Sequence, residues 1–164
     1  MFFGAITSET HSGLEALPGD PESARGGVTG RRILAILKET LPTMITRPGM
    51  YFAHDNGPTF KARIVQNWLR EFAAEHALTV VTWPAFSPDL NPIENCWEVL
   101  KKALKKQHPE LKFMKNNEAS TNLLEVYAFA LWDEIRVGVF FNCVRSMPKR
   151  LQDLRGARSW YIRY

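Results

Sequence analysis

The chain has 164 residues, of which 45% are hydrophobic and 23% charged, a composition that excludes disordered and fibrous proteins and allows one globular core. No apolar run approaches the roughly 20 residues that a membrane helix needs, and the first residues lack the parts of a signal peptide. The two cysteines, Cys96 and Cys143, do not form a paired-cysteine metal motif, which favours a reducing compartment.

The net charge of +4 is unevenly distributed. Residues 1–60 carry five Lys and Arg against six Asp and Glu, whereas residues 61–164 carry sixteen against eleven. The basic residues gather in "KKALKK" at 101–106 and in a second set: Arg145, Lys149, Arg150, Arg155, Arg158 and Arg163. This asymmetry favours a nucleic-acid partner, and a solvated helix face remains the alternative.

In chain order, residues 1–8 and 12–18 are expected to form short strands joined by a polar turn. A helix is then expected after Thr29, a potential N-cap, ending at Pro42 or Pro48. Its apolar residues recur at helical spacing: Ile33, Leu34, Leu37 and Leu41.

Residues 50–54 are expected to form a third strand, which ends at the turn sequence "DNGP". An apolar stripe predicts a helix over residues 60–72. The continuous apolar run at 78–83 then predicts a strand buried on both faces.

A further helix is expected over residues 93–104, and helices over 122–154 broken near Gly138 and Pro148. Strands that alternate with helices predict an α/β fold with parallel neighbouring strands. We expect residues 1–164 to form one domain, because no repeat or linker divides them.

Asp55 lies where an apolar strand ends and a turn begins. Ligands of α/β proteins usually collect at this edge of the sheet. The alternative is that Asp55 and Asn56 only bond their own backbone in a turn.

Glu94 follows the stiff, proline-rich segment "WPAFSPDLNPIENCW" at 83–97. One interpretation is a capping box, with Asn91 at the N-cap, Pro92 at the first helical position and Glu94 at N3. A cap does not need the preceding prolines, so the other interpretation is a catalytic carboxylate held rigidly at a helix start.

Asp55 and Glu94 together suggest a metal site. Two carboxylates at one sheet edge repel each other unless a proton or a cation lies between them. Oxygen ligands favour Mg²⁺ or Mn²⁺, which suit phosphodiester chemistry. The basic second half of the chain would then hold a nucleic-acid backbone.

Four segments resemble the Tc/mariner-type transposases along nearly the whole chain. They are "LPGDPESARGGVTG", "HDNGPTFKARIVQNWL", "WPAFSPDLNPIENCWEVLK" and "SMPKRLQDLRGARSWYIRY". The resemblance implies a ribonuclease-H-like mixed sheet flanked by helices. It also implies that Asp55 and Glu94 are catalytic metal ligands, with Asn56 and Asn91 as neighbours of the site.

The family's activity is cut-and-paste DNA transposition, in which DNA phosphodiesters are cleaved and the 3′-hydroxyl ends are joined to target DNA. The resemblance therefore implies two Mg²⁺ or Mn²⁺ ions in the complete enzyme, and transposon-end and target DNA as partners. A homo-oligomer and a location in the nucleus are further expectations, and no membrane partner is expected.

The sequence departs from the family pattern at its start. The family uses three acidic residues, and the first lies on a strand that would fall before Met1, since neither Glu9 nor Asp20 lies on a suitable strand. The family's N-terminal helix-turn-helix domains are not found either. We therefore expect this fragment to be inactive. The alternatives are a non-catalytic DNA-binding remnant and a different ribonuclease-H-like nuclease.

Other residues are assigned by their position. The lysines that follow Glu94 on its helix, and Arg150, are expected to contact DNA phosphates, with a solvated surface as the alternative for the lysines. These lysines are Lys101, Lys102, Lys105 and Lys106. His54 is expected to face away from Asp55, because neighbours on a strand alternate.

Overall fold

The computed structural model describes residues 1–24, 26–81, 83 and 87–156. These residues form two compact units, each described by itself. The first consists of Met1 and Leu17–Asn91, and the second of Phe2–Ala16 and Pro92–Tyr164. Across the described residues, no helix combines the length and the apolar character that a bilayer crossing requires.

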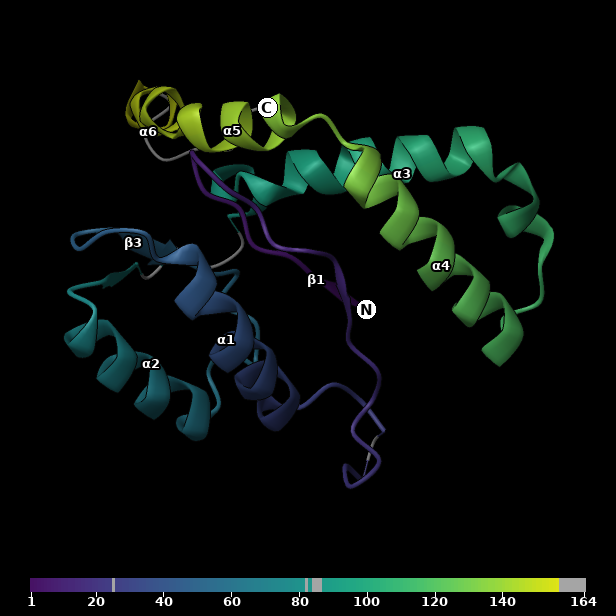
Figure 1. Ribbon diagram of the computed structural model, residues 1–164, viewed down its shortest axis with the longest axis horizontal. Coiled ribbons are helices and arrows are strands. Elements are labelled where there is room, and N and C mark those ends of the chain that lie inside the picture. The colour runs from purple at the N-terminus through teal and green to yellow at the C-terminus, as the bar shows by residue number, and fades with distance from the viewer. Residues whose placement is uncertain (25, 82, 84–86, 157–164) are drawn as a thin grey trace. The chain divides into compact units, whose positions relative to one another are not determined.

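The first unit is built around a strand–helix–strand crossover (Figure 1). Strand β3 (Tyr51–Ala53) pairs in parallel with β4 (Thr79–Val81), and α2 (Arg63–Glu75) connects them. A short 3-10 helix, η1 (Pro88–Leu90), ends the unit. Parallel pairing requires such a crossover, so the predicted α/β connection is confirmed. The predicted burial of the fourth strand on both faces is wrong, because Thr79 is exposed.

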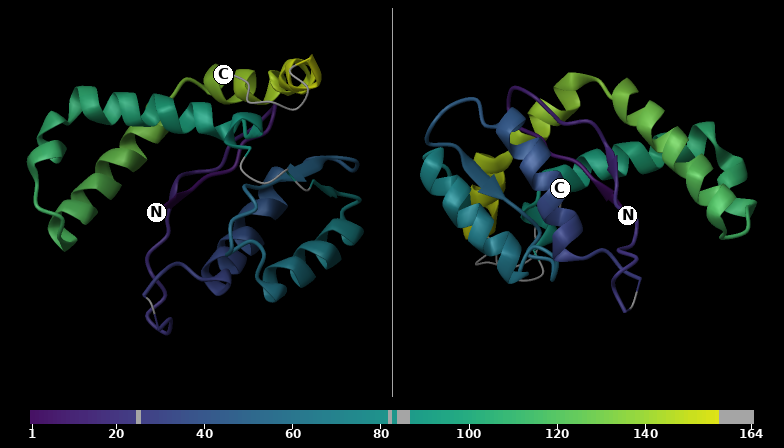
Figure 2. Two further views of the ribbon diagram at one scale, coloured as in Figure 1. Left: turned by 180° about the vertical axis from the view of Figure 1, so that it is seen from behind. Right: turned by 60° about the horizontal axis from the view of Figure 1, so that its bottom comes forward.

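Helix α1 (Gly30–Met44) packs beside α2, and the two remain neighbours in both views of Figure 2. Their apolar stripes supply the core of this unit, including Leu37 and Val65, which are both fully buried. Burying one such side chain stabilises a fold by about 1.5–3 kcal/mol. The predicted helix therefore forms, but Pro42 lies inside it rather than at its end.

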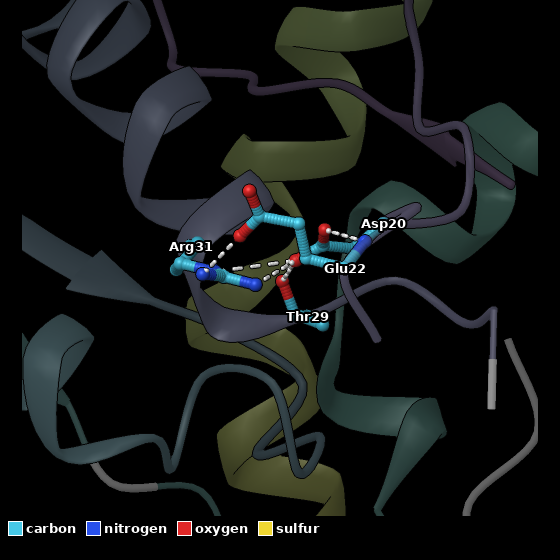
Figure 3. Close-up of polar contacts among 4 residues, drawn as sticks. All are labelled: Asp20, Glu22, Thr29 and Arg31. Atoms are coloured by element: carbon cyan, nitrogen blue, oxygen red, sulfur yellow. Dashed lines mark hydrogen bonds and ion pairs between the residues drawn. The ribbon is translucent and has the colours of Figure 1, made fainter. Parts of the chain in front are cut away.

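The loop before α1 is organised by the buried carboxylate of Asp20 (Figure 3). The Thr29 hydroxyl donates to Asp20 Oδ2 at 2.5 Å, and the Arg31 guanidinium donates to the same oxygen at 3.1 Å. These bonds, the one from Thr29 first, lower the pKa of Asp20. Thr29 is the N-cap residue, as predicted, but its hydroxyl binds Asp20 and makes no cap bond.

In its described residues, the second unit combines an N-terminal hairpin with four α-helices and a 3-10 helix. Strands β1 (Phe2–Phe3) and β2 (Glu15–Ala16) are antiparallel, with Phe2 opposite Ala16. The predicted hairpin is thus confirmed, with shorter strands than expected. The helical elements that follow are α3 (Ile93–Gln107), the 3-10 helix η2 (Pro109–Phe113), α4 (Glu118–Glu134), α5 (Val137–Arg145) and α6 (Met147–Gly156).

The helix breaks expected near Gly138 and Pro148 are confirmed, since the helix is interrupted between α4 and α5 and again between α5 and α6. The chain leaves α4 at Ile135, whose backbone is extended, whereas Gly138 lies inside α5. Pro148 lies in the first turn of α6, where its missing N–H costs no helical bond.

Trp132 is the centre of the second unit's core and is fully buried. Its indole Nε1 donates to the Ser12 carbonyl at 3.0 Å, which ties the hairpin to α4. The hairpin is also held by His11, whose ring stacks on Phe140 of α5 at 4.2 Å. Gly4 allows a further close approach, because a Cβ there would lie 3.1 Å from the Trp132 ring.

Candidate active site

Asp55 lies two residues beyond the end of β3, in the first unit. Ala53 pairs with Val81, so Asp55 belongs to the carboxyl edge of the parallel pair. Its side chain is exposed, and Oδ1 accepts the Gly57 N–H at 3.0 Å. The sequence therefore predicted the position of Asp55 correctly, and the turn interpretation also holds, because the carboxylate bonds its own turn.

His54 and Asn56 flank this carboxylate. The Asn56 N–H donates to His54 Nδ1 at 3.1 Å, and Asn56 Nδ2 donates to the Trp83 carbonyl at 2.7 Å. Asn56 has a φ of 61°, in the left-handed region that asparagine tolerates better than most residues. Its amide thus joins the chain leaving β3 to the chain leaving β4.

His54 is 8% exposed, and its ring stacks on Phe60 with the ring centres 4.5 Å apart and the rings nearly parallel. Burial lowers the pKa of His54, and the charge of Asp55 opposes this shift. Because Nδ1 accepts a backbone N–H, a neutral ring must carry its proton on Nε2. His54 is turned to the buried side, as predicted, but its bond with the Asn56 backbone was missed.

Glu94 lies in the first turn of α3 and is half-buried. Pro92 has helical backbone angles, in agreement with its predicted place at the helix start. The capping-box interpretation misplaces the N-cap, because Pro92 and not Asn91 holds that position, and Pro92 has no side-chain cap bond. Asn91 instead closes η1, where its N–H donates to the Pro88 carbonyl at 3.0 Å.

The structure describes only part of the proline-rich segment that precedes α3. Within it, Leu90 is buried at 2% exposure and anchors η1. Trp83 is described, and its indole Nε1 is buried with no hydrogen-bond partner among the described residues. Pro84, one of the residues expected to stiffen this segment, lies outside the described residues.

Asp55 and Glu94 belong to different units, so their meeting in one site stays a prediction. Nowhere in the described ranges do three or more His, Cys, Asp or Glu side chains gather as a metal would require. The donor chemistry of Asp55 is nevertheless suitable, because an exposed carboxylate supplies the oxygen ligands that Mg²⁺ and Mn²⁺ prefer.

The predicted DNA-binding lysines lie on α3, and they are exposed to solvent. Lys101 forms an ion pair with Glu98 at 3.4 Å, and it follows Glu94 by about two turns on the same side of the helix. The other predicted lysines are Lys102, Lys105 and Lys106. Solvent exposure leaves the ammonium groups of all four lysines accessible to a polyanion.

Arg150 has a structural position, which corrects its predicted role as a phosphate contact. The residue is 2% exposed, so it offers almost no surface to a ligand. Nη2 donates to Asn95 Oδ1 at 2.6 Å, and Nε donates to Ser146 Oγ at 2.8 Å. Arg150 therefore ties α6 to the first turn of α3, next to Glu94. Arg158, another member of the predicted basic set, lies outside the described residues.

A family model described as DDE superfamily endonuclease matches residues 23–115. This span includes Asp55, Glu94 and all four lysines, whereas Arg150 lies outside it.

Two curated transposases are similar to the chain. The transposable element Tc1 transposase of Caenorhabditis elegans is 33% identical over 116 residues, which cover 71% of this chain and 38% of that protein. The transposable element Tcb1 transposase of Caenorhabditis briggsae is 30% identical over 113 residues, 69% of this chain and 37% of that protein. The chain thus spans less than half the length of these relatives.

Solved structures of a mariner transposase share the fold. The Mos1 strand transfer complex aligns with a TM-score of 0.68 at 20% identity, over 99% of this chain and 44% of that one. The catalytic domain of Mos1 mariner transposase aligns with a TM-score of 0.61 at 18% identity, over 99% of this chain and 81% of that one. The predicted ribonuclease-H-like fold class is confirmed.

Proposed function

This chain belongs to the DDE superfamily endonucleases and to their Tc/mariner-type transposases. From that premise we propose that it forms part of a transposase catalytic domain that acts on DNA phosphodiesters. The observation that carries the proposal is the exposed carboxylate of Asp55 at the carboxyl edge of a parallel strand pair, inside the matched span. Ligand sites of α/β folds lie at such edges.

Asp55 and Glu94 would hold the metal in this proposal. A solved structure of the Mos1 catalytic domain contains Mg, which supports a divalent cation here. Bound Mg²⁺ or Mn²⁺ ions would activate the attacking oxygen and stabilise the leaving one. This chain's own contribution is to present Asp55 to solvent and to hold Glu94 in the first turn of α3.

DNA is the proposed partner, and the lysines of α3 are its proposed contacts. Two of them, Lys101 and Lys105, are four residues apart and so share a side of the helix. Ammonium groups on one side of a helix can bind successive phosphates without reading sequence. The likeness to the Mos1 strand transfer complex supports a nucleic-acid role. We also propose self-association and a nuclear location, in keeping with a role in transposition.

The proposal is tested by Mn²⁺ binding and DNA binding measured on the same proteins. We expect D55N and E94Q each to weaken Mn²⁺ binding about tenfold or more, because each removes a charged ligand. Neither substitution touches the lysines, so DNA affinity in the absence of metal should remain unchanged. Mn²⁺ binding that is equal in wild type, D55N and E94Q would overturn the metal assignment.

A non-catalytic DNA-binding module is the second candidate. It is favoured by the exposed lysines of α3, which need no metal to bind a polyanion. It predicts salt-sensitive DNA binding that D55N does not change and no DNA nicking with Mn²⁺. Mn²⁺-dependent nicking that disappears in D55N would exclude it.

A further inference from the structure

The backbone around Asp55 is fixed from both sides by side chains other than its own. We call residues 54–57 the Asp55 turn. On one side His54 Nδ1 accepts the Asn56 N–H at 3.1 Å, and on the other Asn56 Nδ2 donates to the Trp83 carbonyl at 2.7 Å. The carboxylate itself stays exposed. Among the bonds described for this turn, the Asp55 carboxylate therefore takes part in only one, the bond that it accepts from the Gly57 N–H.

His54 is held rigidly enough to act as an anchor. The residue is 8% exposed, and its ring lies flat on Phe60, with ring centres 4.5 Å apart and an interplanar angle of 9°. The Phe60 carbonyl in turn accepts a hydrogen bond from Gln66 Nε2 of α2 at 2.8 Å. The acceptor for the Asn56 N–H is thus fixed by stacking against a residue that is bonded to the crossover helix.

Asn56 adds a second anchor that crosses from one strand end to the other. The left-handed backbone at φ 61° turns the chain, and the Nδ2 bond reaches the segment that follows β4. Left-handed geometry at a residue other than glycine has an energetic cost and persists where the surroundings determine it. Here the two hydrogen bonds of Asn56, from its N–H and from its Nδ2, hold the left-handed backbone in place.

These bonds fix the orientation of Asp55. With its flanking residues bonded, the Cα–Cβ direction of Asp55 is set, and the Gly57 N–H on Oδ1 orients the carboxylate plane. Reactive groups must be held to within about 0.5 Å, which isolated turns on a surface do not achieve. We propose that His54 and Asn56 are positioning residues that aim the Asp55 carboxylate at a divalent cation, an inference that rests on the function proposed above.

Mn²⁺ affinity of the full chain, measured by electron paramagnetic resonance of the free ion, is the first readout. N56G keeps the left-handed backbone but removes the Nδ2 donor, and H54F keeps a flat ring against Phe60 but removes the Nδ1 acceptor. We expect each to weaken Mn²⁺ binding about tenfold, the lower end of the effect of losing an outer-shell partner. H54N should restore most of the affinity, because its Oδ1 can take the place of Nδ1.

N67G is the matched control for simple destabilisation. Asn67 is an exposed residue of α2, where replacing asparagine by glycine costs about 0.3 kcal/mol of stability without touching the Asp55 turn. We expect N67G to lower the melting temperature as N56G does and to leave Mn²⁺ affinity at the wild-type value.

The second readout needs no metal. Three-bond NMR couplings report the χ1 rotamer of Asp55, and we expect one rotamer in wild type and rotamer averaging in N56G. If D55N leaves Mn²⁺ binding unchanged, the metal assignment fails, and the couplings alone decide whether His54 and Asn56 position Asp55. Unchanged couplings in N56G and H54F, with a stability loss like that of N67G, would overturn the proposal.

Discussion

Replacing Arg150 by methionine separates a structural role from a DNA-contacting role. Among its contacts, the guanidinium donates to Asn95 Oδ1 at 2.6 Å and to Ser146 Oγ at 2.8 Å. Hydrogen bonds that involve a charged group contribute about 1.5–3 kcal/mol each, so two of them give about 3–6 kcal/mol. Removing a buried cation also removes its desolvation cost, which offsets part of that loss. We therefore expect R150M to lower the free energy of unfolding by about 2–4 kcal/mol.

Thermal unfolding followed by tryptophan fluorescence measures the stability effect. For a chain of this length, the expected loss corresponds to a fall in melting temperature of about 5–15 °C. N95A and S146A remove one acceptor each and should have smaller effects in the same direction. R150K keeps the charge but not the planar donor geometry, so it should not restore full stability.

The salt dependence of DNA binding measures the competing role. A lysine or arginine that neutralises a phosphate contributes about 0.9 to the slope of log K against log salt concentration. We expect R150M to leave that slope unchanged at a temperature where the variant is folded. A slope reduced by about 0.9, with a melting temperature within about 1 °C of wild type, would refute the structural assignment of Arg150.

Three further predictions concern the lysines, the glycines and the acid response. Changing Lys101, Lys102, Lys105 and Lys106 to glutamine should lower the salt slope by about 0.9 for each phosphate that is no longer neutralised, whereas K38Q on α1 should not. G30A should destabilise the chain by about 1–2 kcal/mol in thermal unfolding, because the new Cβ would clash with the Cβ of Ala62. G138A should instead stabilise α5 by about 0.5–1 kcal/mol, because a Cβ at that position meets no other atom. D20N should melt below wild type at pH 7. Because the pKa of Asp20 is lowered in the folded protein, the stability that its carboxylate contributes is complete above the unfolded pKa of about 3.9 and is lost as the pH falls through the lower folded pKa. The two melting temperatures should therefore converge in acid. A gap between wild type and D20N that persists at low pH would contradict the ionic role of Asp20.

Periodicity predicted the elements of this chain better than their ends. The apolar repeat that places Leu37 in a helix is a property of that segment alone, and the helix forms. Pro42 or Pro48 was expected to end it, and the helix continues past Pro42 to Met44, because packing against α2 outweighs the loss of one backbone bond. The break expected near Gly138 occurs at Ile135, shortly before that glycine, and Gly138 itself lies inside α5, because a helix tolerates an isolated glycine at a cost of only about 1 kcal/mol.

The candidate site was predictable to the extent that its determinants are local. The turn after a strand identified Asp55, and the segment before α3 identified Glu94. The bond from Asn56 to the Trp83 carbonyl was not predictable, because every residue has a carbonyl and sequence does not single one out. Arg150 was misassigned for a related reason: its partner Asn95 is 55 residues away, and a cationic side chain gives no local sign of burial.

The hairpin that precedes Leu17 has a consequence for biosynthesis. Its partner in the core, Trp132, is 120 residues away from Ser12, so a ribosome adding about 5–20 residues per second makes the two ends of this bond roughly 6–24 seconds apart. The elements of the first unit emerge within that interval and are consecutive in the chain. Phe2, whose ring meets Phe129 of α4, therefore reaches this partner only after α4 has been translated, when the elements of the first unit have already been made.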